Sequence, residues 1–306
     1  MRVDGAPLTG PEAREHRLAW RLILPALGIV VLIALFPLAW AIWESLHVHD
    51  LRMPWRGEPF VGLANYREAL SEPRFREALL HTVVFVICSV VPEIVLGTGL
   101  ALVLNRAFRG RGLLRALVLV PWAIPTVVTA LLWRFLFDGS AGIVNALLVD
   151  AGVLEQPFVW FAHAVAAWVP IIAADVWKTT PFVALLVLAG LQNIDPLLYE
   201  AARIDGASAW QRFRHVTLPM VKPAILVALI FRTLDAFRVF DLVYVMTAGG
   251  PGTSTEPVAL YAFSALLQSL RFGYGSAIAV LLFVVTFGFA LLYLRLLGQG
   301  LTRTVE

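Results

Sequence analysis

Six long apolar runs separated by polar segments dominate the chain. A run of about 20 apolar residues is long enough to cross the ~30 Å hydrocarbon core of a membrane as a helix. Strands of a membrane β-barrel would instead alternate between apolar and polar positions, and these runs do not alternate. The pattern therefore predicts an all-α integral membrane protein with six transmembrane helices, at about Leu22–Trp43, Leu79–Asn105, Leu113–Phe137, Ala162–Gln192, Lys222–Thr247 and Phe272–Leu294.

Three of these runs carry marks of irregularity. The third contains Pro121 and Pro125, and the fourth is over-long and contains Pro170 and Pro181, so we expect the fourth helix to be kinked or tilted. The fifth holds four charged residues, which is unusual for a membrane span. The sixth has none.

Basic residues predict the orientation of the chain. Cytoplasmic segments of membrane proteins are enriched in Lys and Arg. With the N-terminus inside, fourteen Lys and Arg residues fall in inside segments and six in outside segments. We therefore expect both termini in the cytoplasm of a bacterial cell, in a multi-pass protein of its inner membrane. The predicted organisation is a cytoplasmic tail (1–21), a first transmembrane helix (22–46), an extracytoplasmic cap (47–78), a transmembrane domain (79–297) and a cytoplasmic tail (298–306).

The first apolar run is expected to be retained as a span. Four arginines precede it, and the run from Leu22 to Trp43 carries no charge, which is longer than the apolar core of a cleavable signal. The cap that follows contains a short polar helix around Asn65–Leu70.

Composition narrows the function classes. The chain is 59% hydrophobic and 15% charged, well below the charge of a soluble domain. Its net charge of +3 comes without a basic cluster, so nucleic acid is not an expected partner. A single cysteine, Cys88, excludes an intrachain disulfide and a thiolate metal site, and we expect it to be packed inside. The scattered His81, His163 and His215 do not form a zinc motif.

The segment 195–223 predicts an ordered pair of helices at the inside surface. Asp195 can cap a helix that begins at Pro196, and Gly206 can end it. A second helix can follow from Ser208, with Leu218-Pro219 at its end. From the residues alone, this pair could rest on the membrane surface or serve as a docking site for another protein.

The residues of this segment resemble the EAA loop of binding-protein-dependent ABC importer permeases. The resemblance covers most of the chain, with a MetI-like permease fold, and implies that the segment docks into an ATPase subunit. The positions that match the family pattern, and so are expected to couple to the ATPase, are Glu200, Ala201, Ala202, Asp205, Gly206, Ala207, Leu218 and Pro219.

The same resemblance implies the partners. They are a second, similar permease subunit, two cytoplasmic ATPase subunits and an extracytoplasmic substrate-binding lipoprotein. The chain has no G-x-x-x-x-G-K-[ST] sequence, so we expect no cofactor on this chain, with ATP and Mg bound by the ATPases. The chain is expected to be non-catalytic, with no metal site and with a sugar and membrane lipid as its other partners.

The fifth run carries the candidate substrate path. Arg232, Asp235, Arg238 and Asp241 recur at three-residue spacing, so their side chains would lie along one side of a single helix. The pattern is typical either of a structural ladder of ion pairs or of the polar wall of a translocation path.

Aromatic residues among these charges favour a sugar as the substrate, because sugars need both hydrogen-bonding groups and aromatic faces. The stretches around Trp177 and Phe237 are similar to those of trehalose-importer permeases of mycobacteria. A disaccharide such as trehalose or maltose is therefore expected. The candidate path residues are Trp177, Lys178, Arg232, Asp235, Phe237, Arg238, Asp241 and Tyr244.

Two further charged positions stay open. Asp175 and Lys178 are three residues apart and can neutralise each other. Glu93 follows Pro92 in the second run, and its partner is not evident. If Glu93, Asp235 and Asp241 were ion sites, the alternative function would be an ion-coupled secondary transporter. Such transporters often have repeated halves, which we do not find here.

Overall fold

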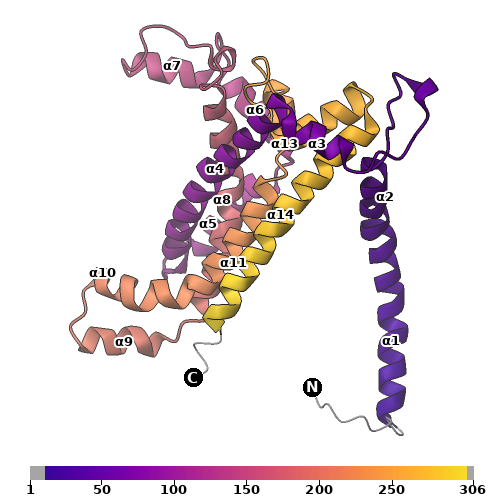
Figure 1. The fold of residues 1–306 in the computed structure, drawn as a ribbon. Helices are drawn as coiled ribbons and strands as arrows, with labels where there is room; N and C mark the ends of the chain where they lie inside the picture. The colour runs from indigo at the N-terminus through magenta and orange to yellow at the C-terminus, as the bar shows by residue number, and fades with distance from the viewer. Residues whose placement is uncertain (1–10, 302–306) are drawn as a thin grey trace.

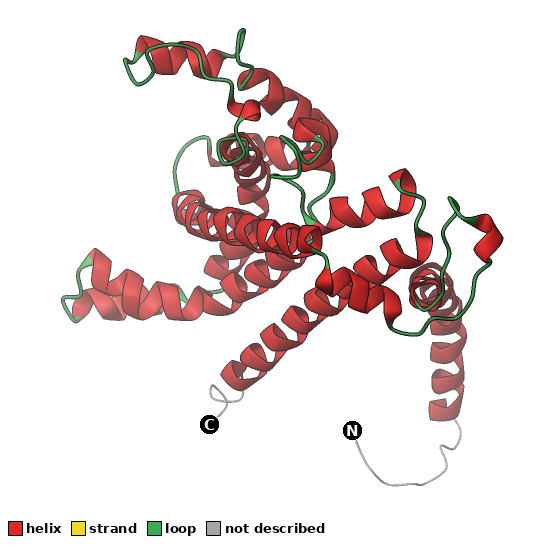
Figure 2. Cartoon of the chain, turned by 45° about the horizontal axis from the view of Figure 1, so that its top comes forward, coloured by secondary structure: helices red, strands yellow, loops and turns green. Residues whose placement is uncertain are grey.

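The computed structural model describes residues 11–301, and all the regular structure within that range is helical (Figures 1 and 2). The helices are α1 (Pro11–Val30), α2 (Phe36–Ser45), α3 (Ala64–Ser71), α4 (Pro73–Asn105), α5 (Arg111–Ala123), α6 (Thr126–Leu136), α7 (Ile143–Asp150), α8 (Trp168–Gln192), α9 (Pro196–Ile204), α10 (Ala209–Arg212), α11 (Leu218–Ala236), α12 (Asp241–Thr247), α13 (Val258–Phe263) and α14 (Phe272–Leu301). π-Helical turns follow α1, α10 and α13, at Val31–Leu35, Phe213–Thr217 and Ser264–Gln268, and 3-10 turns lie at Pro54–Arg56 and Trp160–Ala162.

Five helical segments within the described range are long and apolar enough to cross a membrane. A sixth span exists if the bent pair α5 and α6 is counted as one. The predicted all-α architecture is therefore confirmed. The continuous segments are Leu18–Ser45, Pro73–Asn105, Trp168–Gln192, Ala209–Ala236 and Phe272–Tyr293.

The third predicted span is not a single straight helix. Helices α5 and α6 meet at 91°. Pro125 causes the break, because a residue that precedes proline is driven out of the helical region, and Ile124 is extended with φ −73° and ψ 133°. Pro121 lies inside α5 and does not end it.

The fifth predicted span is also interrupted. Helix α11 ends at Ala236, and α12 begins only at Asp241. Between them, Phe237 turns into the core and is 1% exposed, whereas Arg238 is exposed. The single charged stripe predicted for Arg232 to Asp241 is therefore wrong, because its four members lie on two helices and the link between them.

The ends of the chain are more helical than predicted. Helix α1 begins at Pro11, inside the segment expected to be a tail, and α14 continues past residue 298 to Leu301. Residues 1–10 and 302–306 of the predicted tails lie outside the described range. The rod formed by α1 and α2 stands apart from the other helices and reaches them through the contact of α2 with α14 (Figures 1 and 2).

The bundle is built on α4, α8 and α11, which pack closely through small residues. A Cβ at Gly97 of α4 would lie 2.6 Å from Val183 of α8, and a Cβ at Gly190 of α8 would lie 2.5 Å from Ala224 of α11. Small residues allow such close approach in membranes, where van der Waals packing drives helix association. Cys88 of α4 is exposed in this chain, so the prediction that it is packed inside is wrong.

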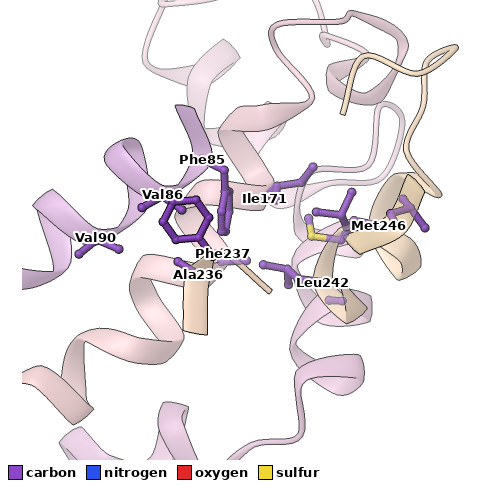
Figure 3. Close-up of a cluster of buried hydrophobic side chains, with 12 residues drawn as sticks. Phe85, Val86, Val90, Ile171, Ala236, Phe237, Leu242 and Met246 are labelled. Carbon is purple, nitrogen blue, oxygen red and sulfur yellow. The ribbon is translucent and has the colours of Figure 1, made fainter. Parts of the chain in front are cut away.

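An apolar core lies where α4, α8 and α12 meet (Figure 3). Phe85 of α4, Ile171 of α8 and Phe237 meet there with Leu242 and Met246 of α12. All five are 2% exposed or less. This core holds α12 and the link before it in place, and so positions the residues beside it.

Polar contacts hold the cap between α2 and α4 in place, and Arg271, just before α14, donates to Glu68 of the cap at 2.6 Å. The predicted polar helix of the cap is present as α3, where the Asn65 amide donates to the carbonyl oxygens of Ser45 (2.8 Å) and His47 (2.9 Å). Arg74 binds Glu256 through two hydrogen bonds of 2.8 and 2.9 Å. Elsewhere in the cap, the hydrogen-bonded Arg52 guanidinium lowers the pKa of Asp50 to about 2.

Candidate functional site

A cavity of about 870 Å³ opens between α8, α11 and α14, beside the core. Its volume lies within the ~300–1,000 Å³ typical of small-molecule sites. The lining combines aromatic rings with polar side chains. The aromatic residues are Phe85, Trp122, Phe182, Phe231, Phe240, Phe283 and Phe287, and the polar ones are Thr126, Asp175, Lys178, Thr179, Arg232, Asp235, Arg238, Asp241 and Thr286.

Five of the eight candidate path residues line this cavity: Lys178, Arg232, Asp235, Arg238 and Asp241. They come from α8, α11, the link and α12, so the interruption of the fifth span does not remove them from one wall. Charged side chains on neighbouring helices share this wall because α11 packs against α8.

The three aromatic candidates do not line this cavity. Phe237 belongs to the core, with its ring centroid 4.9 Å from that of Phe289. Tyr244 stacks outside the cavity on Phe240, at 5.3 Å. Trp177 packs against Trp133 at 6.0 Å. The rings that do line the cavity come mainly from α8, α11 and α14, and two of them, Phe231 and Phe240, are among the aromatic residues of the fifth run that favour a sugar.

Arg232 is the centre of a buried ion-pair cluster that joins three helices. Its Nε lies 2.5 Å from Glu93 Oε2 and its Nη2 lies 2.9 Å from Glu93 Oε1. Nη2 also lies 3.1 Å from Asp175 Oδ2, and Nη1 lies 2.5 Å from Asp235 Oδ2. The side chains of Arg232 and Glu93 are 3% and 0% exposed. Such a buried pair is tolerated because each charge finds partners at close range.

Two hydroxyl groups donate further hydrogen bonds to the Glu93 carboxylate. Thr179 donates to Glu93 Oε1 at 2.7 Å, and so does Ser89 at 2.7 Å. The Ser89 hydroxyl also contacts Asp175. The open question about Glu93 is therefore answered: it faces the interior of the bundle and binds an arginine 139 residues further along the chain.

The pairing expected between Asp175 and Lys178 is absent. Asp175 binds Arg232, and the Lys178 ammonium lies 3.5 Å from the carbonyl oxygen of Trp122. Arg238 approaches Asp235 only to 3.9 Å, with both side chains well exposed. Of the predicted ladder along the fifth span, the close contact is the one between Arg232 and Asp235, which share α11.

The second candidate site is the helix pair α9 and α10 at one end of the molecule (Figure 1). The Asp195 side chain accepts from the Leu197 amide and caps α9. Ser208 and Gln211 form a capping box at the start of α10. Gly206 connects the helices with φ +75°, a conformation that other residues adopt only at a cost. The two predicted helices and their turn are confirmed.

One boundary in this segment differs from the prediction. Leu218-Pro219 does not end the second helix, because α10, the π-turn at Phe213–Thr217 and α11 form one continuous rod from Ala209 to Ala236. Pro219 lies in the first turn of α11, directly after this π-turn. The rod therefore joins the helix pair directly to the cavity wall that carries Arg232.

The surface of the helix pair is open. Six of its candidate residues, Glu200, Ala201, Asp205, Gly206, Leu218 and Pro219, are exposed, and Ala202 and Ala207 are half-buried. A hollow of about 300 Å³ lies at the turn, lined by Ala202, Asp205, Gly206, Ala207, Gln211, Arg212, His215 and Val216. Beside it, Ile204 is 87% exposed and Trp210 65% exposed, so apolar side chains are available there to another surface.

Metal-binding chemistry has no support in the described residues. Within residues 11–301, His, Cys, Asp and Glu do not gather in a group of three or more that could hold a metal ion.

Comparison with known proteins gives a family match. Residues 93–301 match the family described as "Binding-protein-dependent transport system inner membrane component". Curated relatives align over nearly the whole chain. The trehalose/maltose transport system permease protein MalF of Thermococcus litoralis is 46% identical over 92% of this chain and 94% of its own length. The trehalose transport system permease protein SugA of Mycobacterium tuberculosis is 40% identical over 95% and 92%.

Other similar proteins extend the range of substrates and support the fold. The sulfoquinovosyl glycerol transport system permease protein SmoG of Agrobacterium fabrum is 39% identical over 92% of this chain and 91% of its own. A crystal structure of a bacterial ABC transporter that imports the acidic polysaccharide alginate contains a chain with TM-score 0.80 and 23% identity, covering 94% of this chain and 96% of that one. That likeness shows a shared fold.

Proposed function

Because the chain belongs to the family of binding-protein-dependent transport system inner membrane components, we propose that it is the permease subunit of an ATP-driven importer for a carbohydrate. The observation that carries the proposal is the cavity, which combines aromatic rings with charged side chains beside a helix joined to α9 and α10. Sugars are bound by this combination, since C–H faces pack on rings and hydroxyls hydrogen-bond to polar groups.

A disaccharide of the trehalose or maltose type is the proposed substrate. The relatives at 46% and 40% identity are named for trehalose/maltose and trehalose transport. The cavity volume of about 870 Å³ leaves room for a solute of this size.

The proposed partners are a second permease subunit, two cytoplasmic ATPase subunits and an extracytoplasmic binding protein. One side of the cavity is open in this chain, and the second permease would close it. The ATPases would carry ATP and Mg. This chain would then move the sugar without chemical change, as a non-catalytic subunit of the inner membrane with both termini in the cytoplasm.

The helix pair α9 and α10 is the proposed coupling surface. The exposed small residues Ala201 and Gly206 allow close approach of an ATPase, and Ile204 and Trp210 supply apolar contact. Movement of α10 would be transmitted along the continuous rod to Arg232, because a helix carries a displacement at one end to the other. Alternating access would then follow from a shift of α11 against α4 and α8.

The test is uptake of labelled trehalose into vesicles that contain the co-expressed complex, with and without ATP. Gly206→Pro is compared with Gly152→Pro, a matched control at the other end of the molecule. Both glycines have positive φ, +75° and +71°, and both donate their N–H to the carbonyl three residues earlier, at 3.0 and 2.9 Å. Proline locks φ near −65° and removes this donor, so the local damage is equal.

We expect wild-type uptake to require ATP, Gly206→Pro to lose most of it and Gly152→Pro to keep it. Co-purification of the ATPase with each variant shows whether docking itself is lost. Uptake that proceeds on an ion gradient without ATP would contradict the proposal and favour the ion-coupled transporter. Equal loss in both variants would contradict the assignment of α9 and α10 as the coupling surface.

A further inference from the structure

Every nitrogen of the Arg232 guanidinium contacts a carboxylate, although this residue lies on the wall of the cavity. Each of its three nitrogens donates to a carboxylate: Nε to Glu93, Nη1 to Asp235 and Nη2 to both Glu93 and Asp175. Glu93 takes two of these contacts, in the side-by-side geometry that gives arginine its strongest pairing with an anion. The arginine therefore has no free nitrogen to offer an anionic solute.

Glu93 also determines the net charge at the cavity wall. Three acidic and three basic side chains line the cavity: Asp175, Asp235 and Asp241 against Lys178, Arg232 and Arg238. Glu93 lies behind them, 0% exposed, and adds one negative charge. With it, the balance of the site is negative. Without it, the wall would be neutral, and Arg232 would keep only Asp175 and Asp235 as partners, with its Nε left free.

The partners of Arg232 leave acceptors on the cavity side. The Asp175 and Asp235 side chains are 14% and 63% exposed, and the contacts to Arg232 use one oxygen of each. A carboxylate oxygen accepts from a sugar hydroxyl, but it repels a carboxylate or phosphate on the solute. An unpaired arginine would do the opposite, because its planar fork binds such anions.

We propose that Glu93 is a positioning residue that sets the charge selectivity of the cavity: by holding Arg232, it makes the site favour uncharged polyhydroxylated solutes over acidic sugars. The inference rests on the proposed carbohydrate transport and adds a residue that determines which class of sugar passes. One sequence relative, at 39% identity, is named for transport of the sulfonated sugar sulfoquinovosyl glycerol, so similar permeases differ in the charge of the solute in their names.

The experiment measures binding to the purified complex of permease subunits and ATPases, without the extracytoplasmic binding protein, so that the selectivity belongs to the cavity. Labelled trehalose is displaced by unlabelled trehalose or by trehalose 6-phosphate, and the ratio of the two inhibition constants is the readout. The variants are Glu93→Gln, which keeps the shape, and the double variant Glu93→Gln/Arg232→Gln, which removes both charges. Glu77→Gln, an exposed position of α4, is the matched control.

We expect Glu93→Gln to shift the ratio about tenfold toward the phosphate ester, which corresponds to about 1.4 kcal/mol. The double variant is expected to return the ratio to within about threefold of wild type, and Glu77→Gln to leave it unchanged. A purely structural role would lower the affinity for both sugars equally. An unchanged ratio in Glu93→Gln, or a ratio that stays shifted in the double variant, would overturn the inference.

Two further results distinguish the remaining outcomes of this experiment. If Glu93→Gln does not assemble, Asp175→Asn removes another carboxylate from the same guanidinium nitrogen and must shift the ratio in the same direction, or the inference fails. If the wild-type complex binds neither sugar, the cavity does not select between the sugars by itself and the inference fails, whereas the proposed carbohydrate function is judged by the uptake experiment. Wild-type binding of trehalose with no shift in any variant would overturn the inference alone.

Discussion

Phe237 and Phe231 illustrate how neighbouring aromatic residues of one segment serve different purposes. Phe237 is 1% exposed and fills the core between α4, α8 and α12, whereas Phe231 is 57% exposed and lines the cavity. The difference arises because α11 ends at Ala236, so that Phe237 can turn inward. Phe237 therefore contributes to stability, and Phe231 contributes to the surface of the cavity.

Phe237→Ala is expected to lower the free energy of unfolding by about 3 kcal/mol, the lower end of the range for removal of a buried phenyl ring. Phe231→Ala is expected to change it by less than about 1 kcal/mol while weakening trehalose binding. Denaturation of each purified variant by titration with sodium dodecyl sulfate measures the first quantity, and displacement of labelled trehalose measures the second. Equal destabilisation by both changes would show that the two rings are not divided in this way.

Local residue chemistry was predictable from the sequence where its partners are close along the chain. The Asp195 cap, the Gly206 turn and the Ser208 cap involve groups within a few residues, and all three are present. The partner of Glu93 was not predictable, because Arg232 is 139 residues away and the contact depends on how α4 and α11 pack. Asp175 and Lys178 were matched by spacing, but the nearby Arg232 takes the carboxylate.

At the scale of elements, α8 and α11 are in close contact between the helix pair α9 and α10 and the cavity. Gly190 on α8 faces Ala224 on α11 and leaves no room for a further methyl group. Helix positions that require a small residue on each side fix the distance between the axes. A change in this distance would also move Arg232, which lies two turns further along α11.

Gly190→Ala alone is expected to destabilise the complex by about 1–3 kcal/mol, as overpacking does. Ala224→Gly in the same chain should restore most of that loss, because it moves the methyl group from one helix to the other. Thermal unfolding of the purified single and double variants checks this. A double variant no more stable than Gly190→Ala would contradict direct contact between α8 and α11 at these two residues.

Helix interruptions were only partly predictable. Prolines in the third and fourth runs predicted irregular helices. Pro125 breaks its helix by 91°, whereas Pro181 lies inside a continuous α8. The break after Ala236 has no proline or glycine at all. It coincides with the burial of Phe237 in the tertiary core, and periodicity within the run does not contain that information.

At the scale of the whole molecule, the helix pair α9 and α10 and the described ends of the chain lie on a common side. Helices α9 and α10 lie at the same end as the start of α1 and the end of α14, and α3, α7 and α13 lie at the opposite end (Figure 1). The distribution of Lys and Arg predicts that the first end is cytoplasmic. The number of spans agrees with the six expected from hydropathy when α5 and α6 are counted as one.

Cysteine labelling tests this orientation. In a Cys88→Ser background, needed because Cys88 is exposed, Glu155→Cys is expected to react with a membrane-impermeant maleimide on intact cells. Glu200→Cys should react only after the cells are permeabilised. Both positions are exposed glutamates, so they form a matched pair. Labelling of Glu200→Cys in intact cells would reverse the predicted topology.

The ion pair between Glu93 and Arg232 also has a consequence for biosynthesis. A ribosome adds about 5–20 residues per second, so the 139 residues that separate the two positions take roughly 7–28 s to synthesise. Throughout that interval α4 has left the ribosome with a carboxyl group whose partner does not yet exist. An unpaired polar group in hydrocarbon is costly. The carboxyl group of Glu93 therefore needs a polar environment, such as the insertion machinery, until α11 is inserted and the helices pack around the ion pair.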